Sequence, residues 1–441
     1  MALKVGLITL SQPRERVDLA QSFHASAQEA LERAGFQVCS HPDLVFDAPT
    51  SIRAAQACKE EGACCVFLLL GTWIDSPVVV DTLRAVRIPF AIWAEDNPAS
   101  FSLTAGGIVH GSLDEFGLKH RFIYGSPSAP ELMEEVSAYV RGAACSTGLE
   151  GQRLCVVGGR VPGMYTTMAD IIQIKDRFGV ETEHLDSLKV YLTAESLPAA
   201  EVEKAAAEIR SQFGAITVEA PVLDRSVRLY LALKQILTER GYKMAAVKCM
   251  DEMINNYCSF CLAVSLLNDD GFTVSCEGDI YGAITMEVLR ILSAGAALFG
   301  DVNHLDHANS ILRIVNCGSM ASSLAESRKD VDLAGQYEYI SDAGGAVTTF
   351  SVRSGLATAA RLFRIKGSLG MVVFEGEMER RPKEVFKEAR GVWPHAFMKL
   401  HCDSRALVQH LRSNHMHAGF GHHLAALREF CQLTDVEVMV P

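Results

Sequence analysis

Two acidic positions in the second half of the chain have the chemistry to bind a hard divalent cation. Glu277 follows the apolar run 274–276, and Asp301 follows a second short apolar run, 297–299. A predicted helix over 283–293 separates the two runs, so we expect both acids at the carboxyl edge of one parallel sheet, where open α/β sheets build their sites. Carboxylate oxygens are preferred ligands of Mn²⁺ and Mg²⁺. The pair therefore predicts a shared metal site.

Other interpretations of these acidic residues stay open. Asp279 can simply cap the helix that follows it, and Glu277 or Asp301 can be solvated loop acids. Asp251 and Glu252 follow a predicted strand over 244–249 and form a rival acidic pair. The sequence alone therefore gives two locations for a carboxylate site.

Histidines are concentrated near the C-terminus and could supply a nitrogen ligand. His415 and His417 lie in the segment NHMH, and His422 and His423 follow a glycine shortly after. A histidine tract can be a metal site, although a single histidine is more often at the surface or in a satisfied core position. The upstream carboxylate pair lacks a nitrogen ligand, which favours a role for this tract.

Two further motifs have simpler interpretations. Cys258 and Cys261 have CxxC spacing, but no second pair at similar spacing exists, so a structural zinc site is not expected. We interpret them as core residues, with a redox role as the alternative. The glycine turn at 157–163 does not follow the GxGxxG pattern. It is typical of a tight strand-to-helix crossover, and we predict no NAD site.

The pattern of apolar runs predicts the elements that must position these residues. Short apolar runs alternate with helical segments over the first third of the chain, and again after a small-residue break at 142–151. Alternation of this kind predicts parallel sheets wound on both faces by helices. After about Asp306 short strands are broken by glycines. The predicted fold is α/β, with two doubly wound parallel-sheet domains (1–148 and 149–306) followed by a β-rich, barrel-like C-terminal domain (307–441).

Composition excludes several classes of function. The chain has 441 residues, 49% of them hydrophobic, and a formal net charge of −12. A net negative chain argues against a nucleic-acid partner, and no apolar run is long enough for a membrane span. Lys4 interrupts the first apolar run, which we interpret as a strand and not a signal peptide. The 13 cysteines have no even framework and indicate reduced thiols in a cytoplasmic protein.

Several segments together resemble the L-fucose isomerase and L-arabinose isomerase superfamily. The phrase CEGDIYGAITM at 276–286 is similar to the family's strand that ends in a glutamate, with an acid two residues on. ALFGDV at 297–302 is similar to its next strand, which carries a second acidic ligand. The histidine segment 413–438 resembles the family's C-terminal histidine, helix and last strand. Gly71-Thr72-Trp73 resembles a tryptophan loop that reaches a neighbouring subunit's site.

The resemblance implies a fold, a reaction and a set of residues. The reaction is aldose–ketose isomerisation through a cis-enediol, in a homo-oligomer such as a hexamer with sites between subunits. The implied ligands of one Mn²⁺ ion (or Mg²⁺ or Co²⁺) are Glu277, Asp301 and His415, and Glu277 and Asp301 are also the implied catalytic carboxylates. The implied substrate contacts are Arg14, Arg16, Trp73, Trp393 and His417.

The sequence does not determine which sugar is the substrate or which group transfers the carbon-bound proton. The loops that grip the sugar in the family are not recognisable here. An acidic or sulfonated hexose such as sulfoquinovose, held by Arg14, Arg16 or Arg160, is therefore an alternative. A non-catalytic sugar-binding relative is the alternative from another class. Within an isomerase, the two carboxylates could also hold only the metal while a bound water moves the proton.

Overall fold

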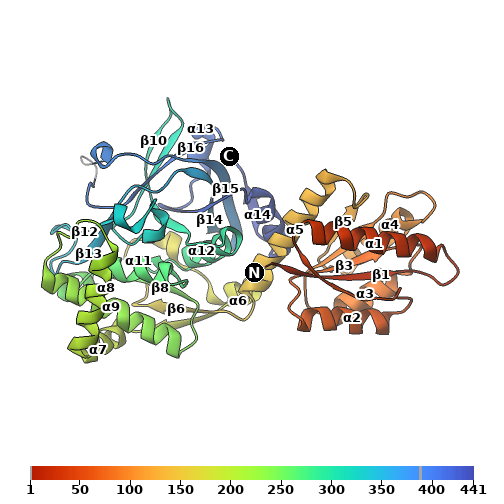
Figure 1. The fold of residues 1–441 in the computed structure, drawn as a ribbon, viewed down its shortest axis with the longest axis horizontal. Coiled ribbons are helices and arrows are strands. Elements are labelled where there is room, and N and C mark those ends of the chain that lie inside the picture. Colours follow the sequence, from red (N-terminus) through yellow and green to blue (C-terminus); the bar gives the residue numbers. More distant parts are fainter. Residues whose placement is uncertain (1, 387–389) are drawn as a thin grey trace. The chain divides into compact units, whose positions relative to one another are not determined.

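The computed structural model describes residues 2–386 and 390–441, which form two compact units (Figure 1). The N-terminal unit contains the residues up to Gly148 together with Ala425–Thr434. The second unit contains Leu149–Leu424 and Asp435–Pro441. Across the described ranges, we find no helix with the length and apolar character needed to cross a membrane.

The N-terminal unit is built on five parallel strands in the order β2-β1-β3-β4-β5. β3 and β4 are buried along their whole length, which explains their unbroken apolar sequences. The elements are β1 (Lys4–Leu10), α1 (Val17–Arg33), β2 (Gln37–Ser40), α2 (Ala48–Glu60), β3 (Val66–Leu70), α3 (Ser76–Ala85), β4 (Phe90–Ala94), α4 (Ser102–Glu115), β5 (Arg121–Tyr124) and α5 (Pro130–Leu149). Most of α14 (Leu424–Leu433) belongs to this unit. It lies so close to α5 that a Cβ on Gly142 would be 2.7 Å from the carbonyl oxygen of Ala426.

The second unit begins with four parallel strands in the order β7-β6-β8-β9. The strands are β6 (Arg153–Val157), β7 (Glu181–Leu185), β8 (Met244–Val247) and β9 (Thr273–Cys276). The helices are α6 (Ile171–Phe178), α7 (Ser187–Ser196), α8 (Ala199–Gln212), α9 (Ala220–Glu239), α10 (Glu252–Asn256), α11 (Cys261–Asp269) and α12 (Ile280–Ser293).

Six antiparallel strands then close into a barrel in the order β14-β17-β10-β11-β16-β15, and β15 pairs back with β14. The strands are β10 (Leu298–Asp306), β11 (Ile311–Val315), β14 (Gly355–Ile365), β15 (Ser368–Met378), β16 (His395–Leu400) and β17 (His415–Phe420). β18 (Glu437–Met439) joins β15, β12 (Asp332–Gly335) pairs with β13 (Ala346–Thr349), and α13 (Ser404–His410) precedes β17. The predicted fold class, parallel sheets with helices followed by a barrel-like β-rich part, is confirmed.

One element differs from the sequence prediction in a way that matters for the site. We expected Glu277 and Asp301 at the edge of one parallel sheet, and this was wrong. β10 pairs antiparallel with β11 and β17 in the barrel, while β9 ends the parallel sheet. The connecting helix α12 is buried on every side over residues 280–289. A helix that is apolar all round lies between two layers, so the chain leaves one sheet and enters another.

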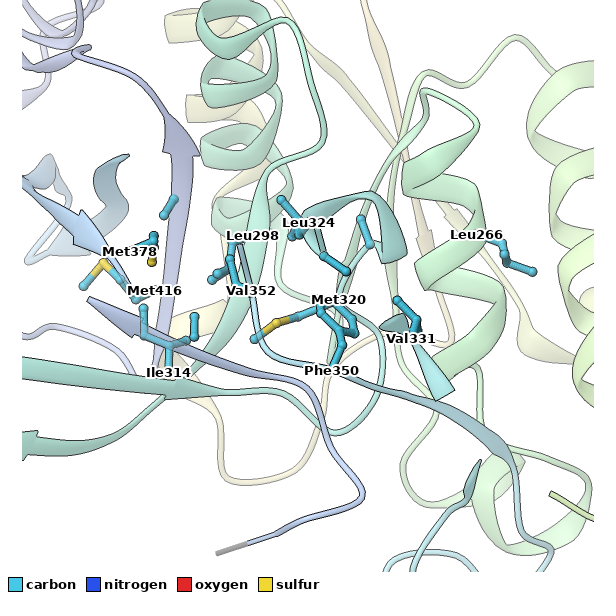
Figure 2. Packing of buried hydrophobic residues seen from close by; sticks show 14 of the residues in the cluster. Leu266, Leu298, Ile314, Met320, Leu324, Val331, Phe350, Val352, Met378 and Met416 are labelled. Carbon is cyan, nitrogen blue, oxygen red and sulfur yellow. The ribbon is translucent and has the colours of Figure 1, made fainter. Parts of the chain in front are cut away.

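One hydrophobic cluster joins the barrel to helices α8, α9 and α11. Figure 2 shows part of it, with Met320 and Phe350 lying among residues that include Leu298 of β10 and Val331. Burial of each such side chain stabilises the fold by roughly 1.5–3 kcal/mol. This shared core fixes β10 and β17 relative to the parallel sheet, and so fixes the residues at their ends.

Candidate metal and catalytic site

The turn after β9 holds Glu277 in a strained backbone conformation. Glu277 has φ +59° and the next residue, Gly278, has φ +64°. A left-handed conformation costs a residue with a side chain roughly 1–2 kcal/mol, and such strain is concentrated at functional sites. Asp279 then caps α12 by accepting a hydrogen bond from the Gly282 amide at 2.9 Å. The turn therefore fixes two carboxylates at the start of a buried helix.

Strand register brings Asp301 and His415 together. They are directly opposite each other on the antiparallel strands β10 and β17. Asn414 Nδ2 donates a hydrogen bond to Asp301 Oδ1 at 2.7 Å. Because side chains alternate along a strand, His417 points to the same face of β17 as His415. Both histidines lie against the ring of Phe299.

His415 is the centre of the site. Its Nε2 lies 3.0 Å from Glu277 Oε2 and 3.8 Å from Asp301 Oδ1, and its Nδ1 lies 2.7 Å from Asp279 Oδ2. One ligand atom from each of Glu277, Asp301 and His415 lies within 4.8 Å of the others. A carboxylate on one ring nitrogen, with the other nitrogen free to bind, is the usual arrangement of a metal-ligating histidine. The donor set therefore fits a hard divalent cation.

Behind Asp279 lies an arginine that the sequence interpretation missed. Arg361 donates from Nη1 to Asp279 Oδ2 and from Nη2 to the carbonyl oxygen of Thr166 at 2.9 Å. The side chains of Arg361 and Asp279 are 1% and 0% exposed. A lone charged residue, Arg361, inside the otherwise apolar segment 359–363 was the signal that could have indicated a buried ion pair. The contacts run from Arg361 through Asp279 to His415.

Burial and charge act in opposite directions on the titratable groups here. Burial raises the pKa of Glu277 and of Asp301, although His415 opposes the shift in each. Burial also disfavours ionised Asp279, but the charge of Arg361 and the hydrogen bond from His415 outweigh it and lower the pKa. Burial opposes charge on His415, yet its hydrogen bonds to Asp279 and Glu277 raise the pKa of the imidazole to about 10. Without metal, His415 therefore carries a proton on both nitrogens.

His417 and Trp393, the substrate residues predicted in this unit, are placed differently relative to this group. His417 is fully buried, with Nε2 3.2 Å from Arg361 Nη1. Burial, and then the charge of Arg361, lowers the pKa of this imidazole well below its usual range. Trp393 Nε1 donates to Gln336 Oε1 at 2.7 Å, and Gln336 Nε2 donates to the Cys317 carbonyl oxygen at 2.9 Å. His417 therefore faces Arg361, and Trp393 is linked through Gln336 to the loop beside Glu277.

The remaining predicted substrate residues lie in the N-terminal unit. Arg14 is exposed in the turn after β1, and Arg16 pairs with Asp18 at 2.6 Å. Trp73 is half-buried, with Nε1 3.4 Å from Asp75. They are not among the residues that surround Glu277 within the second unit.

The rival acidic pair is placed differently from Glu277 and Asp301. Asp251 and Glu252 are exposed, and Glu252 forms an ion pair with Lys248 at 2.9 Å. Within the described parts of the chain, neither acid joins two further potential ligands. Cys258 and Cys261 are both buried, and all 13 cysteines are free thiols.

Replacing Gly278 with alanine is expected to damage the site more than the fold. A Cβ on Gly278 would lie 2.5 Å from the carbonyl oxygen of Gly159, and the positive φ adds strain. We expect a loss of unfolding free energy of about 1–3 kcal/mol and a roughly 10–100-fold loss of Mn²⁺ affinity as Glu277 shifts. Urea denaturation and equilibrium dialysis measure the two effects. Gly271→Ala is the matched control, because Gly271 also has positive φ but open space around its Cβ position. Equal Mn²⁺ affinity in both variants would contradict the prediction.

Comparison with known proteins agrees with the resemblance seen in the sequence. Residues 314–440 match the L-fucose isomerase C-terminal domain. A sulfoquinovose isomerase of Alkalicoccus urumqiensis is 24% identical over 318 residues, covering 69% of this chain and 70% of that protein. A sulfoquinovose isomerase of Priestia megaterium is also 24% identical, but the match spans only 59% of its length and 58% of this chain. An L-arabinose isomerase of Nocardioides sp. is 23% identical over 402 residues, or 83% of this chain and 78% of that protein.

Proposed function

We propose that this chain, which is related to the L-fucose and L-arabinose isomerase superfamily, is a metal-dependent aldose–ketose isomerase. The observation that carries the proposal is the position of His415, with Nδ1 on Asp279 and Nε2 beside Glu277 and Asp301. Relatives named as sugar isomerases support the reaction class. The carboxylate and imidazole donors support Mn²⁺ as the cofactor, with Mg²⁺ or Co²⁺ as alternatives.

Glu277, Asp301 and His415 would hold the metal, which supplies a Lewis acid that polarises the sugar's oxygens when bound. A carboxylate beside the sugar takes the proton from C2 and returns it to C1 through a cis-enediol, while a second acid moves the hydroxyl proton from O2 to O1. Glu277 suits this role because burial raises its pKa towards neutral pH, where a base is most effective. Asn414 donates to Asp301 and favours its ionised form. Asp279 and Arg361 orient His415 without reaching the sugar.

A panel of aldoses tests the proposal directly. Protein stripped with a chelator is incubated with each aldose, with and without Mn²⁺, and ketose formation is followed by NMR. We expect turnover of at least one aldose that depends on added Mn²⁺. Turnover that survives the chelator unchanged, or sugar binding without turnover of any aldose, would contradict the proposal. The second outcome would indicate a non-catalytic sugar-binding protein.

Metal affinity is expected to rise with pH. His415 Nε2 must lose its proton before it can bind a cation, and the pKa of about 10 means that nearly all metal-free protein is protonated between pH 6 and pH 8. Each pH unit in that range should therefore increase the apparent Mn²⁺ affinity by up to about tenfold. The rise should level off near pH 10. Calorimetry in buffers of different ionisation enthalpy measures both the affinity and the released proton, and His415→Gln should flatten most of the dependence.

A sulfonated hexose is the substrate that one further observation favours. Four relatives are named sulfoquinovose isomerase, and Arg160 follows Gly159, whose carbonyl oxygen lies against the Glu277–Gly278 turn. The side chain of Arg160 is exposed. It could pair with a sulfonate on the sugar bound at that turn.

The variant Arg160→Gln is expected to lower kcat/KM for the sulfonated hexose by about 10–100-fold, because a charged hydrogen bond contributes roughly 1.5–3 kcal/mol. The kcat/KM for a neutral hexose should stay unchanged. Arg353→Gln is a matched control, because Arg353 is also exposed and lies over the ring of Phe420 as Arg160 lies over that of Tyr165, but it is not part of the loop that carries Gly159. A parallel loss for both sugars would argue against sulfonate recognition by Arg160.

The proposed assembly is a homo-oligomer, hexameric or related, in which Trp73 reaches the Glu277 site of a neighbouring chain. The loop that carries Trp73 follows the buried strand β3, so it is presented at a sheet edge. Light scattering at micromolar concentration tests the assembly. A fully active monomer would contradict it.

A further inference from the structure

Four thiols lie in a row behind Glu277 and have no part in the proposed reaction. The Sγ atoms of Cys276 and Cys317 lie within 4.8 Å of each other, and Cys249 and Cys261 are the neighbouring thiols of Cys276 and Cys317, respectively. The four residues come from separate segments: the end of β9, the chain after β8, the loop after β11 and the start of α11. Cys317 is partly exposed and the other three are buried. The fold therefore gathers these thiols, and Cys317 is the one that is partly exposed.

Two of these thiols and one carboxylate already have the spacing of a cation site. The Sγ atoms of Cys276 and Cys317 and a carboxylate oxygen of Glu277 lie within 4.8 Å of one another. Zn²⁺ binds thiolate sulfur at about 2.3 Å and carboxylate oxygen at about 2.0–2.2 Å, in tetrahedral geometry. Only small side-chain movements are needed to bring the three atoms to those distances from one point.

The loop that carries Cys317 is held in place by its neighbours. Asn316 Oδ1 accepts hydrogen bonds from the Gly318 amide and from Ser319 Oγ, both at 2.9 Å. Gly318 has φ +113°, and a Cβ there would lie 2.4 Å from Val347. Gln336 Nε2 donates to the Cys317 carbonyl oxygen at 2.9 Å. A ligand on a loop fixed in this way needs little reorganisation to bind.

We propose that Cys276, Cys317 and Glu277 form a second cation site, selective for a soft divalent ion such as Zn²⁺ or Cd²⁺, which shares Glu277 with the hard-cation site. Soft thiolates select these ions over Mn²⁺ and Mg²⁺. Cys249 neighbours Cys276 but lies outside the group of three, so its side chain would have to move to supply a fourth ligand. The thiols lose their protons to solvent as the ion binds, and no oxidation is involved.

Sharing Glu277 makes the two sites compete. The same carboxylate belongs to the group with Cys276 and Cys317 and to the group with Asp301 and His415. A soft ion that draws Glu277 towards the thiols removes a ligand and the base from the hard-cation site. It therefore inhibits the enzyme. This consequence rests on the proposed function, whereas binding of the ion does not.

Titration of the Mn²⁺-loaded protein with Cd²⁺ tests the inference. We expect the ultraviolet thiolate-to-cadmium charge-transfer band to saturate at one equivalent of Cd²⁺ per chain. Turnover should fall in proportion to the band, and a dithiol chelator should restore it. Cys317→Ser should keep its basal turnover and need at least roughly tenfold more Cd²⁺ for the band and for inhibition. Cys402→Ser is the matched control, because Cys402 is also partly exposed but belongs to no such group among the described residues. It should behave as the unchanged protein.

The outcomes separate this site from the proposed function. A band that persists unchanged in Cys317→Ser, or inhibition with no band, would overturn the soft-cation site. A Cys317-dependent band in a protein that isomerises no aldose would support the site and contradict the proposed function. Cys276→Ser provides a second variant if Cys317→Ser fails to fold, and loss of the band in that variant gives the same support.

Discussion

Glu277→Gln is expected to lower turnover by about 10²–10⁴-fold with the fold intact. The amide keeps the size of the side chain and can still accept a hydrogen bond from His415, whose Nε2 lies 3.0 Å away. It cannot take a proton from carbon, and it is a weaker ligand for a hard cation. The strained backbone at φ +59° is set by the turn and not by the carboxylate, so the variant should fold. Ketose formation at saturating aldose measures the loss.

Two controls decide what such a loss means. The metal content of Glu277→Gln must be measured in the same sample, because a lost metal would imitate a lost base. Glu252→Gln changes an exposed acid that pairs with Lys248, and its turnover should stay near normal. Near-normal turnover of Glu277→Gln together with an inactive Glu252→Gln would move the site to Asp251 and Glu252.

The sequence could predict which residues meet, but it could not predict how they meet. Glu277, Asp301 and His415 were indicated by their types and by the family resemblance, and the structure brings all three together. The predicted arrangement, with both acids at one edge of a parallel sheet, was wrong, because β10 belongs to the barrel. A short apolar run has the same appearance in either kind of sheet. Which strands β10 pairs with depends on packing around α12, and this packing cannot be predicted from a local sequence pattern.

Arg361 shows a second limit of prediction from the sequence. Its partner Asp279 is 82 residues away along the chain, and the contact exists only because β14 packs against α12. Asp279 itself could be predicted only as a helix cap, and it does cap α12. Its other contacts, with His415 and Arg361, depend on the closed barrel. Residues that position a metal-binding side chain, such as Arg361, are therefore harder to predict than the metal-binding residue itself.

Arg361→Met is expected to destabilise the metal-free protein by about 3–5 kcal/mol. Methionine fills a similar volume but leaves Asp279 buried without its main cation, since both side chains are at most 1% exposed. Asp279→Asn alone should also be costly, because it leaves Arg361 as the unpaired charge. The double variant should recover most of the loss, because both charges are gone. Asp279 serves the Gly282 amide with Oδ1 and His415 Nδ1 with Oδ2, and the single asparagine oxygen can replace only one of these acceptors, so the recovery is incomplete. Urea denaturation of the four proteins gives the coupling free energy.

Measuring Mn²⁺ affinity distinguishes a positioning role of Arg361 and Asp279 from a merely structural role. A carboxylate on Nδ1 orients His415 and increases its basicity, and losing such a group typically lowers metal affinity by about 10–100-fold. The double variant should therefore regain stability while its Mn²⁺ affinity stays low, because asparagine cannot replace the charge of Asp279. Recovery of both quantities together would mean that Arg361 and Asp279 serve only the fold. Recovery of stability alone would mean that the buried pair is retained for the ligand it positions.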